Sequence, residues 1–388
     1  MLDLTASAAP AFSLDVDQIA VRDMARAFAD EVFAPNAIAW DEKKHFPVAE
    51  MRKAAALGMG GAFIAEDVGG SGLSRLTASV IFEALATGCP TVAAYMSIHN
   101  MTSWLIDAFG SDAQRKQWLP KLCTMELLAS YCLTEPGAGS DAAALTTRAG
   151  RDGDHYVLNG QKQFISGAGA SDLYVVMART GGDGASGISA FLVPGDTPGL
   201  SFGANERKMG WNAQPTRAVV FENARVPAGN RLGPEGEGFK IAMAGLDGGR
   251  LNIAACSLGG AQSAFERTLA YMKERKAFGK RLDEFQALQF RLADMATALE
   301  ASRALLWRAA AAFDRKDANT TQLSAMAKRF VTDAAFDVAN QALQLHGGYG
   351  YLSEYGIEKI VRDLRVHQIL EGSNEIMRLI VARSLVGR

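Results

Sequence analysis

The sequence has few cysteines, and none of them forms a recognisable pair. Its four cysteines, Cys89, Cys123, Cys132 and Cys256, lie far apart, with no CxxC motif and no histidine at metal-ligand spacing. We therefore expect reduced, buried thiols, and neither a disulfide framework nor a metal site.

An excess of charge of one sign is also lacking, and so are long apolar runs. The 388 residues carry 40 Lys and Arg against 42 Asp and Glu, a net charge of −2 that gives no global field for nucleic acid or an anionic membrane. No apolar run reaches the ~18 residues that suggest a membrane span. The first residues lack the pattern of a signal or transit peptide, so we expect a short loose N-terminal arm. These features predict a protein of the cytoplasm, or of the mitochondrial matrix after loss of a presequence, that binds neither nucleic acid nor membrane.

The common fingerprints of nucleotide and hydrolase sites are missing as well. The GxG in SGAGASD (Ser166 to Asp172) precedes the strand-like LYVVMA, where a dinucleotide-binding fold requires a helix. Walker A, HExxH and GxSxG patterns are absent. The NTPase, zinc protease and serine hydrolase classes therefore lose their main support.

Apolar periodicity divides the chain into three regions. Helical spacing extends from about residue 16 to 118, β-rich runs from about 131 to 239, and helical spacing again from about 241 to the end. This order predicts an α+β multidomain protein. It has an N-terminal all-α domain (1–128), a middle antiparallel β-barrel or sandwich (129–240) and a C-terminal α-helical bundle (241–388).

Three local expectations follow from the same patterns. The glycine-rich segment Gly58 to Ser74 predicts a loop between helices. Asn159-Gly160, between two short β-rich runs, predicts a tight hairpin. Long apolar stripes predict helices over Phe285 to Asp314 and Thr320 to Leu345, whose faces also suit an oligomer interface.

The segment TEPGAGSD, Thr134 to Asp141, lies where the first helical region meets the β-region. Its Gly, Pro, Ser and Asp residues are typical of turns, and composition alone favours a polar interdomain turn. Small residues also let backbone amides and hydroxyls approach a cofactor closely, which is the functional alternative.

Together with other motifs in the same order, this segment resembles the acyl-CoA dehydrogenase family. The resemblance extends from about Asp15 to Arg383 and implies the same three-domain fold, an FAD cofactor and oxidation of an acyl-CoA thioester at its α and β carbons. The other motifs are QFIS (Gln163 to Ser166), ERKAFGK (Glu274 to Lys280), QLHGGYG (Gln344 to Gly350) and ILEGSNEIMR (Ile369 to Arg378).

The resemblance implies three groups of FAD contacts. One group would face the isoalloxazine ring: Tyr131, Leu133, Thr134, Gly139, Ser140, Phe164, Ile165 and Ser166. A second would reach the adenine and pyrophosphate, in part from a neighbouring subunit: Arg275, Phe285, Gln286, Gln344, Leu345, Gly347 and Gly348. A third would complete the adenosine pocket: Ser373, Asn374 and Glu375. A cofactor shared between subunits implies an oligomer, and the family is commonly tetrameric, so we expect a homotetramer.

Glu371 resembles the family's catalytic base. A glutamate before Gly-Ser is by itself more often solvated than catalytic, and the surrounding LEGSNE match reverses that expectation. Burial against the acyl chain should raise the pKa of Glu371, because desolvation disfavours the charged form. The resemblance also implies that the backbone N–H of the base helps to bind the thioester oxygen. Residues implied to hold the acyl-CoA are Ser140, Asp247, Gly248, Gly249, Arg250, as principal anchor, and Arg383.

Substrate choice depends on finer resemblance. Some branched-chain members carry the base where this sequence has Gly249, which disfavours an isovaleryl-type enzyme. The strings GWNAQPTRAVVFE, LDGGRLNIAACSLG and VHQILEGSNE favour the conversion of isobutyryl-CoA to methacrylyl-CoA in valine catabolism, with an electron-transfer flavoprotein as acceptor. A 2-methylbutyryl-CoA or butyryl-CoA dehydrogenase is the alternative. An acyl-CoA oxidase and a non-catalytic flavin-binding scaffold are the alternatives from other classes.

Overall fold

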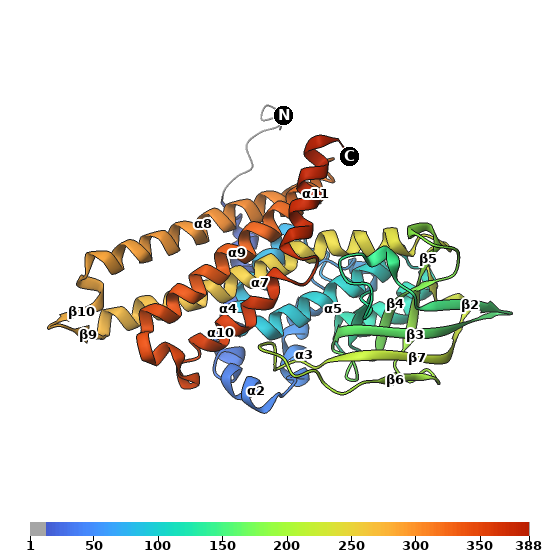
Figure 1. Cartoon of the computed structure of the whole chain (residues 1–388), viewed down its shortest axis with the longest axis horizontal. Coiled ribbons are helices and arrows are strands. Elements are labelled where there is room, and N and C mark those ends of the chain that lie inside the picture. The colour runs from blue at the N-terminus through green and yellow to red at the C-terminus, as the bar shows by residue number, and fades with distance from the viewer. Residues whose placement is uncertain (1–12, 388) are drawn as a thin grey trace.

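The computed structural model describes residues 13–387, and its elements run as two helical layers beside a β-domain (Figure 1). The predicted N-terminal arm lies outside the described residues. The predicted order of a helical, a β and a second helical domain is confirmed.

The N-terminal domain consists of helices, three of which, α1, α4 and α6, begin with a side-chain cap. Asp15 and Ser111 each form a capping box with the residue three positions on, at the starts of α1 and α6. Residues 57–74 connect α3 to α4 through short 3-10 turns, so the loop predicted there is confirmed. The helices are α1 (Val16–Phe28), α2 (Ala37–Lys43), α3 (Val48–Ala56), α4 (Arg75–Gly88), α5 (Pro90–Phe109) and α6 (Asp112–Cys123).

The middle domain is built on an eight-stranded sheet with the order β6-β7-β3-β2-β4-β5-β8, and β1 joins it beside β4. Most neighbours are antiparallel, as expected, but β1 and β2 pair with β4 in parallel. The strands are β1 (Ala129–Cys132), β2 (Arg148–Asp152), β3 (His155–Ser166), β4 (Leu173–Arg179), β5 (Ile188–Pro194), β6 (Leu200–Phe202), β7 (Thr216–Pro227) and β8 (Arg231–Leu232).

The tight hairpin predicted at Asn159-Gly160 is wrong, because β3 continues through both residues. The backbone amide of Asn223, on β7, donates to Asn159 Oδ1 (2.8 Å) at a shift in register between the two strands. Gly160 has φ +144°, and a Cβ there would lie 2.6 Å from Thr147 Oγ1. The conformational freedom of the dipeptide therefore serves a bulge and a close approach rather than a turn.

The C-terminal domain is a bundle around the long helix α7 (Gly238–Glu274), which extends from the β-domain to the far end of the molecule (Figure 1). α7 packs on α4 and α5 of the first domain and on α8 and α9 of its own. The predicted long helices are confirmed as α8 (Gln286–Asp314) and α9 (Thr320–His346). The remaining elements are the pair β9 (Lys276–Ala277) and β10 (Lys280–Arg281), α10 (Ile357–Arg365) and α11 (Asn374–Val386).

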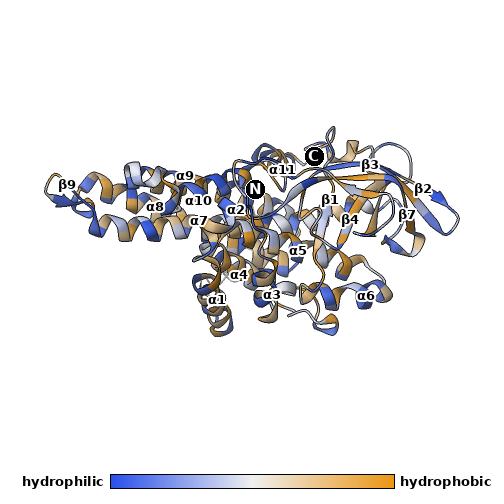
Figure 2. Ribbon diagram, turned by 90° about the horizontal axis from the view of Figure 1, so that it is seen from below, coloured by the Kyte–Doolittle hydropathy of each residue, from blue (hydrophilic) through white to orange (hydrophobic). Residues whose placement is uncertain are grey.

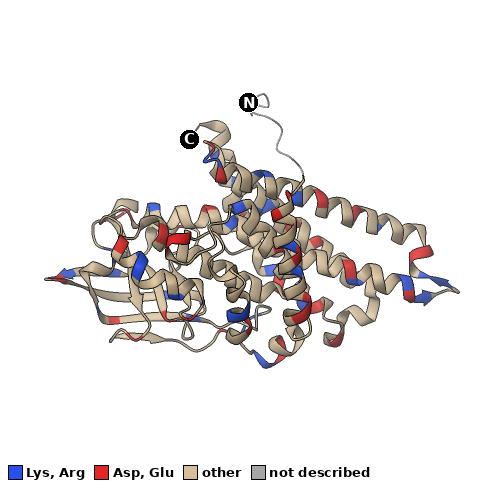
Figure 3. Cartoon of the chain, turned by 180° about the vertical axis from the view of Figure 1, so that it is seen from behind, with Lys and Arg blue, Asp and Glu red and all other residues tan. Residues whose placement is uncertain are grey.

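Hydropathy and charge follow this architecture. Apolar and polar segments alternate along α8 and α9, as expected for helices that bury one face (Figure 2). Acidic and basic residues are mixed along the ribbon (Figure 3). All four cysteines are free and buried, which confirms that prediction. No described helix has both the length and the apolar character that crossing a membrane requires. Residues 13–387 contain no group of three or more His, Cys, Asp or Glu side chains placed to hold a metal ion.

Candidate active site

Glu371 lies in the short connection between α10 and α11, in an unusual backbone conformation. Its φ is +58° and that of Gly372 is +90°, so two consecutive residues are left-handed before Ser373 caps α11. A non-glycine residue in this region costs on the order of 1–3 kcal/mol and persists only where its surroundings enforce it.

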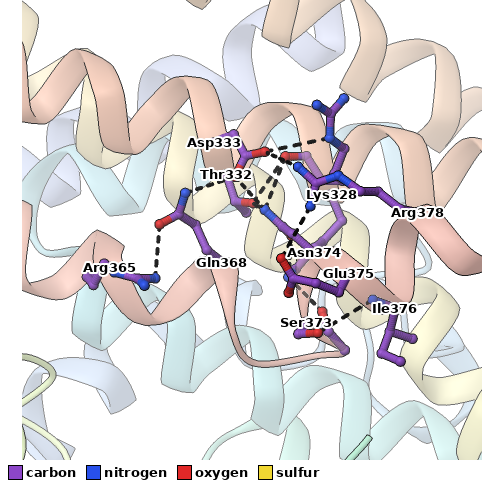
Figure 4. Close-up of polar contacts among 12 residues, drawn as sticks. Lys328, Thr332, Asp333, Arg365, Gln368, Ser373, Asn374, Glu375, Ile376 and Arg378 are labelled. Atoms are coloured by element: carbon purple, nitrogen blue, oxygen red, sulfur yellow. Dashed lines mark hydrogen bonds and ion pairs between the residues drawn. The ribbon is translucent and has the colours of Figure 1, made fainter.

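Helix α9 holds this connection in place (Figure 4). The buried Lys328 ammonium donates to the Gly372 carbonyl (2.8 Å) and to Asn374 Oδ1 (2.9 Å). The amide of Asn374 donates in turn to Asp333 Oδ1 (2.7 Å) and Thr332 Oγ1 (3.0 Å). These bonds fix the backbone on both sides of the left-handed turn.

The carboxyl group of Glu371 is turned toward α7. Its Oε2 is buried and has no hydrogen-bond partner among the described residues. A Cβ added to Gly249, on α7, would overlap Oε2 and would lie 2.6 Å from Met101 Sδ, on α5. Burial raises the pKa of Glu371 to about 7, while the positive charges of Arg250 and Lys328 limit the rise. The site therefore holds a carboxyl group whose free oxygen faces apolar surroundings at the α5–α7 contact.

The segment predicted to hold acyl-CoA is arranged around this carboxyl group. Arg250 is only 4% exposed. It pairs with Asp247 (2.5 Å), and its Nε donates to the backbone carbonyl of Glu371 (3.4 Å). Asp247 also accepts from Thr321 Oγ1, on α9 (2.7 Å). The predicted principal anchor for CoA is thus a buried side chain that contacts the backbone of Glu371, whereas Arg383 is exposed on α11.

A buried ion pair shapes the TEPGAGSD loop. Glu135 accepts from Lys162 Nζ (2.8 Å) and from the backbone amides of Thr146 (2.6 Å) and Thr147 (2.9 Å). Although burial opposes ionisation, Lys162 and these donors lower the pKa of Glu135 to about 2. Gly139 and Ser140 are left exposed, with open space around the position of a Gly139 Cβ. The segment is therefore a fixed, open loop rather than a loose interdomain turn.

The two stretches predicted to face the isoalloxazine ring lie together. The backbone amide of Gln163 donates to the Thr134 carbonyl (2.8 Å), which joins the end of β3 to the loop. Phe164 has φ +60° and is 64% exposed, although it lies on a strand of a well-packed domain. Its neighbour Ser166 accepts from Gln214 Nε2 at Oγ (3.2 Å). The exposed ring of Phe164 is therefore available to contact a ligand.

Tyr131 connects this region to α7 and the neighbourhood of Glu371. Its hydroxyl donates to the Ala242 carbonyl of α7 (3.2 Å). Burial first, and the nearby Glu371 carboxylate second, raise the pKa of Tyr131 well above its usual value. Leu133 and Ile165 are buried beneath the same surface. The structure therefore brings Glu371 and the predicted isoalloxazine-facing residues to one region.

The residues predicted to contact the adenine and pyrophosphate of FAD lie far from Glu371. A cavity of about 830 Å³ is lined by Arg275, Gln344, Leu345, Gly347 and Gly348, among others. Phe285 and Gln286 lie outside its lining, at the start of α8. At 1.5 Å per residue, α7 places Arg275 roughly 39 Å from Gly249. One dinucleotide does not span this distance, so a single chain does not bring the two groups together.

The three residues predicted to complete the adenosine pocket, Ser373, Asn374 and Glu375, differ in how far their side chains are exposed. Every polar atom of the Asn374 side chain is used inside the protein, by Lys328, Thr332 and Asp333. Glu375 is exposed and Ser373 half-buried at the start of α11. Ser373 Oγ accepts from the backbone amide of Ile376 (3.5 Å), so Glu375 is the one of the three with an exposed side chain.

Lys328, Met101 and Thr321 also contribute to the site, and the sequence did not predict these contributions. They reach the site from helices without a functional motif, and only the lysine, within the apolar stretch SAMAKRFV, gave a signal.

This combination of a β-domain between two helical domains, with a buried carboxyl group facing the first long helix after the sheet, defines an acyl-CoA dehydrogenase. The chain belongs to that family: the acyl-CoA dehydrogenase N-terminal, middle and C-terminal domains match residues 15–126, 130–224 and 236–386. Among its relatives is the mitochondrial isobutyryl-CoA dehydrogenase of Bos taurus, 57% identical over 97% of this chain and 91% of that protein. The corresponding protein of Dictyostelium discoideum is 56% identical over the same shares.

Solved structures agree with this assignment. Butyryl-CoA dehydrogenase from Megasphaera elsdenii superposes with a TM-score of 0.94, at 38% identity, over 96% of this chain and 99% of that one. The FAD complex of PigA superposes with a TM-score of 0.93, at 30% identity, over 96% and 98%.

Proposed function

We propose that this chain is an FAD-dependent dehydrogenase that converts isobutyryl-CoA to methacrylyl-CoA in valine catabolism, with Glu371 as the base. The observation that carries the mechanism is the buried, unpartnered Oε2 of Glu371 against Gly249. The identities of 57% and 56% to proteins named isobutyryl-CoA dehydrogenase support the substrate.

The residues at the site fit FAD. The open loop at Gly139 and Ser140, the exposed Phe164 ring and the Ser166 hydroxyl form a surface of small and aromatic groups beside the base. When bound there, FAD supplies N5 as the acceptor of the β-hydride. The cavity at Arg275 and Gly347 offers a cation and open backbone at the other group of predicted contacts.

The protein's own groups account for the removal of the α-proton. A base with a pKa near 7 matches the operating pH better than an ordinary carboxylate, and its Oε2 needs to break no hydrogen bond before it accepts a proton. Among residues 13–387, no acceptor takes the backbone N–H of Glu371. That donor is available for the thioester oxygen, where it stabilises the charge that develops as the proton leaves. Arg250 holds the carbonyl of the same residue and so orients this peptide group.

Butyryl-CoA is the second candidate substrate. It is supported by the likeness to the butyryl-CoA dehydrogenase of Megasphaera elsdenii. The substrates differ by the position of one methyl group, and a pocket discriminates such a change by only ~1–3 kcal/mol.

The proposal also covers the oligomeric state of the protein, its electron acceptor and its cellular compartment. Separation of the two cofactor-binding groups along α7 supports a cofactor shared between subunits, as in a homotetramer. An electron-transfer flavoprotein would reoxidise the flavin, in the cytoplasm or the mitochondrial matrix. The domain divisions at residues 128 and 240 stay predictions.

Anaerobic reduction of the flavin tests the proposal. The purified protein is mixed with isobutyryl-, 2-methylbutyryl-, butyryl- or isovaleryl-CoA while the flavin absorbance is followed. Fastest bleaching by isobutyryl-CoA supports the proposed substrate, and a preference for another ester replaces that substrate but keeps the mechanism. If FAD is bound and no ester bleaches it, the protein is a non-catalytic scaffold. Oxygen-driven turnover equal to dye-driven turnover would identify an oxidase.

A further inference from the structure

Arg75, the first residue of α4, has a buried guanidinium group without hydrogen-bond partners. The residue is 5% exposed, and neither Nη1 nor Nη2 has a partner among the described residues. The group lies over the ring of Phe63, 3.6 Å from its centroid, with Trp104 and Phe313 at 4.8 and 4.9 Å. Three aromatic faces compensate part of the cost of burying the charge, but they leave its N–H donors unsatisfied.

The backbone that carries Arg75 is held in place by α8. The backbone amides of Arg75 and Leu76 donate to the two oxygens of Asp314, on α8 (2.7 and 3.1 Å). This carboxylate fixes the start of α4 and provides the nearest opposite charge without touching the guanidinium. Burial still lowers the pKa of Arg75 to about 9, so the group is a cation at neutral pH.

The guanidinium lies against Gly248, the residue that precedes Gly249 on α7. A Cβ at Gly248 would lie 2.8 Å from Arg75 Nη1, while the adjacent Gly249 faces Glu371 and Met101. The two helices run antiparallel, because Asn252 of α7 donates to Ser97 of α5 and Gly245 faces Leu105. Trp104, one turn beyond Met101, therefore places the Arg75 cage on the side of Glu371 that leads toward Gly245.

We propose that Arg75 is a specificity-determining residue whose guanidinium ends the acyl pocket and restricts the enzyme to short acyl chains. The inference rests on the proposed function, because it takes the acyl carbons to lie between Glu371 and the two bare glycines. An acyl chain that extends past Gly248 meets a cation which it cannot hydrogen-bond and which the aromatic cage prevents from moving. A short acyl group ends before this point and leaves the cation undisturbed.

The test is a chain-length profile of Arg75→Met, which keeps most of the side-chain length and removes the charge and donors. The kcat/KM values for isobutyryl-, butyryl-, hexanoyl- and octanoyl-CoA are measured with an artificial electron acceptor on FAD-loaded protein. We expect the ratio of octanoyl-CoA to isobutyryl-CoA to rise by about 10-fold or more, a change of the size that pocket residues produce. If Arg75→Met does not yield FAD-loaded protein, Arg75→Lys takes its place, with a smaller shift in the same direction.

The matched control is Arg303→Met, which removes another poorly exposed arginine of the helical domains, paired with Glu83. Its chain-length ratio should equal that of the wild type. The inference is overturned if the Arg75 variants keep the wild-type ratio of octanoyl-CoA to isobutyryl-CoA turnover while the wild-type enzyme oxidises isobutyryl-CoA. That outcome leaves the proposed function standing. Absence of wild-type activity on every acyl-CoA overturns the proposed function itself. Wild-type turnover of glutaryl-CoA that is lost in Arg75→Met would show that the guanidinium binds a carboxylate, which also overturns the inference.

Discussion

Oε2 of Glu371 and the bare Cα of Gly249 face each other across the contact between the catalytic loop and α7, without room for a methyl group between them. The glycine therefore leaves the space that the carboxyl group occupies. It also leaves the carboxyl free of the hydrogen bond that a polar side chain at this position would form.

Gly249→Ala should lower kcat by about 10²-fold, because the methyl group displaces the base from its position and small misplacements of reacting groups have effects of this size. Turnover with isobutyryl-CoA measures the effect at equal FAD content. Gly229→Ala is the control, since nothing lies within 4 Å of a Cβ at that position. Normal activity of Gly249→Ala would show that the carboxyl group has another productive position.

Flavin reduction should speed up as the pH rises through about 7, because Glu371 accepts a proton only when it is ionised and its pKa is raised to about 7. Stopped-flow reduction between pH 5.5 and 8.5 measures this midpoint. A rate already at its plateau at pH 5.5 would place the midpoint near the ordinary glutamate value of 4.5 and mean that the carboxyl group is solvated.

The same raised pKa links pH to stability. The folded protein favours the neutral carboxyl, so this contribution to stability is fully present below pH 4.5 and is lost as the pH rises through about 7. The difference between these values corresponds to roughly 3 kcal/mol at most. Glu371→Gln should therefore unfold at a higher temperature than the wild type at pH 8.5. The two proteins should unfold at similar temperatures at pH 4.5. Equal melting temperatures at both pH values would contradict the burial of the charge.

Lys328→Met removes two hydrogen bonds to the catalytic loop and a positive charge that lowers the pKa of Glu371. The midpoint of the pH profile should move upward, and kcat at pH 7 should fall while FAD stays bound. Lys240→Met, which alters an exposed lysine at the start of α7, should leave the midpoint unchanged. A loss of activity without a shift in midpoint would reduce Lys328 to a structural support.

Lys162→Met leaves the buried Glu135 without its opposite charge, with only the donors of Thr146 and Thr147 to stabilise the carboxylate. It should destabilise the protein by about 3–5 kcal/mol and weaken FAD retention, because the TEPGAGSD loop loses its anchor. Urea unfolding and FAD release measure the two effects. The double variant Glu135→Gln/Lys162→Met should be less destabilised than Lys162→Met alone. Equal stability of the wild type and Lys162→Met would show that the pair does not hold the loop.

The long helices were predictable from the sequence, and the proposed base could be named from it, because each has a local signal. The apolar stripes of α8 and α9 repeat over many turns, and Glu371 lies within a distinctive motif. The hairpin prediction failed because Asn-Gly marks a backbone freedom that a bulge uses as well as a turn. The parallel pairing of β1 with β4 joins residues that are far apart in the sequence, so no local pattern encodes it. Lysine and arginine are normally solvated on helices. The apolar stretch SAMAKRFV hints that Lys328 is buried, whereas only the packing shows it for Arg75.

The reductive half-reaction of Glu371→Gln with isobutyryl-CoA tests the central claim most directly. The variant keeps the size of the side chain and removes the base, so FAD content and binding of a CoA ligand should match the wild type. The rate of flavin bleaching should fall by roughly 10²–10⁴-fold, the contribution of a positioned base. A variant that binds FAD and ligand normally and still bleaches at a near-wild-type rate would show that another group removes the α-proton.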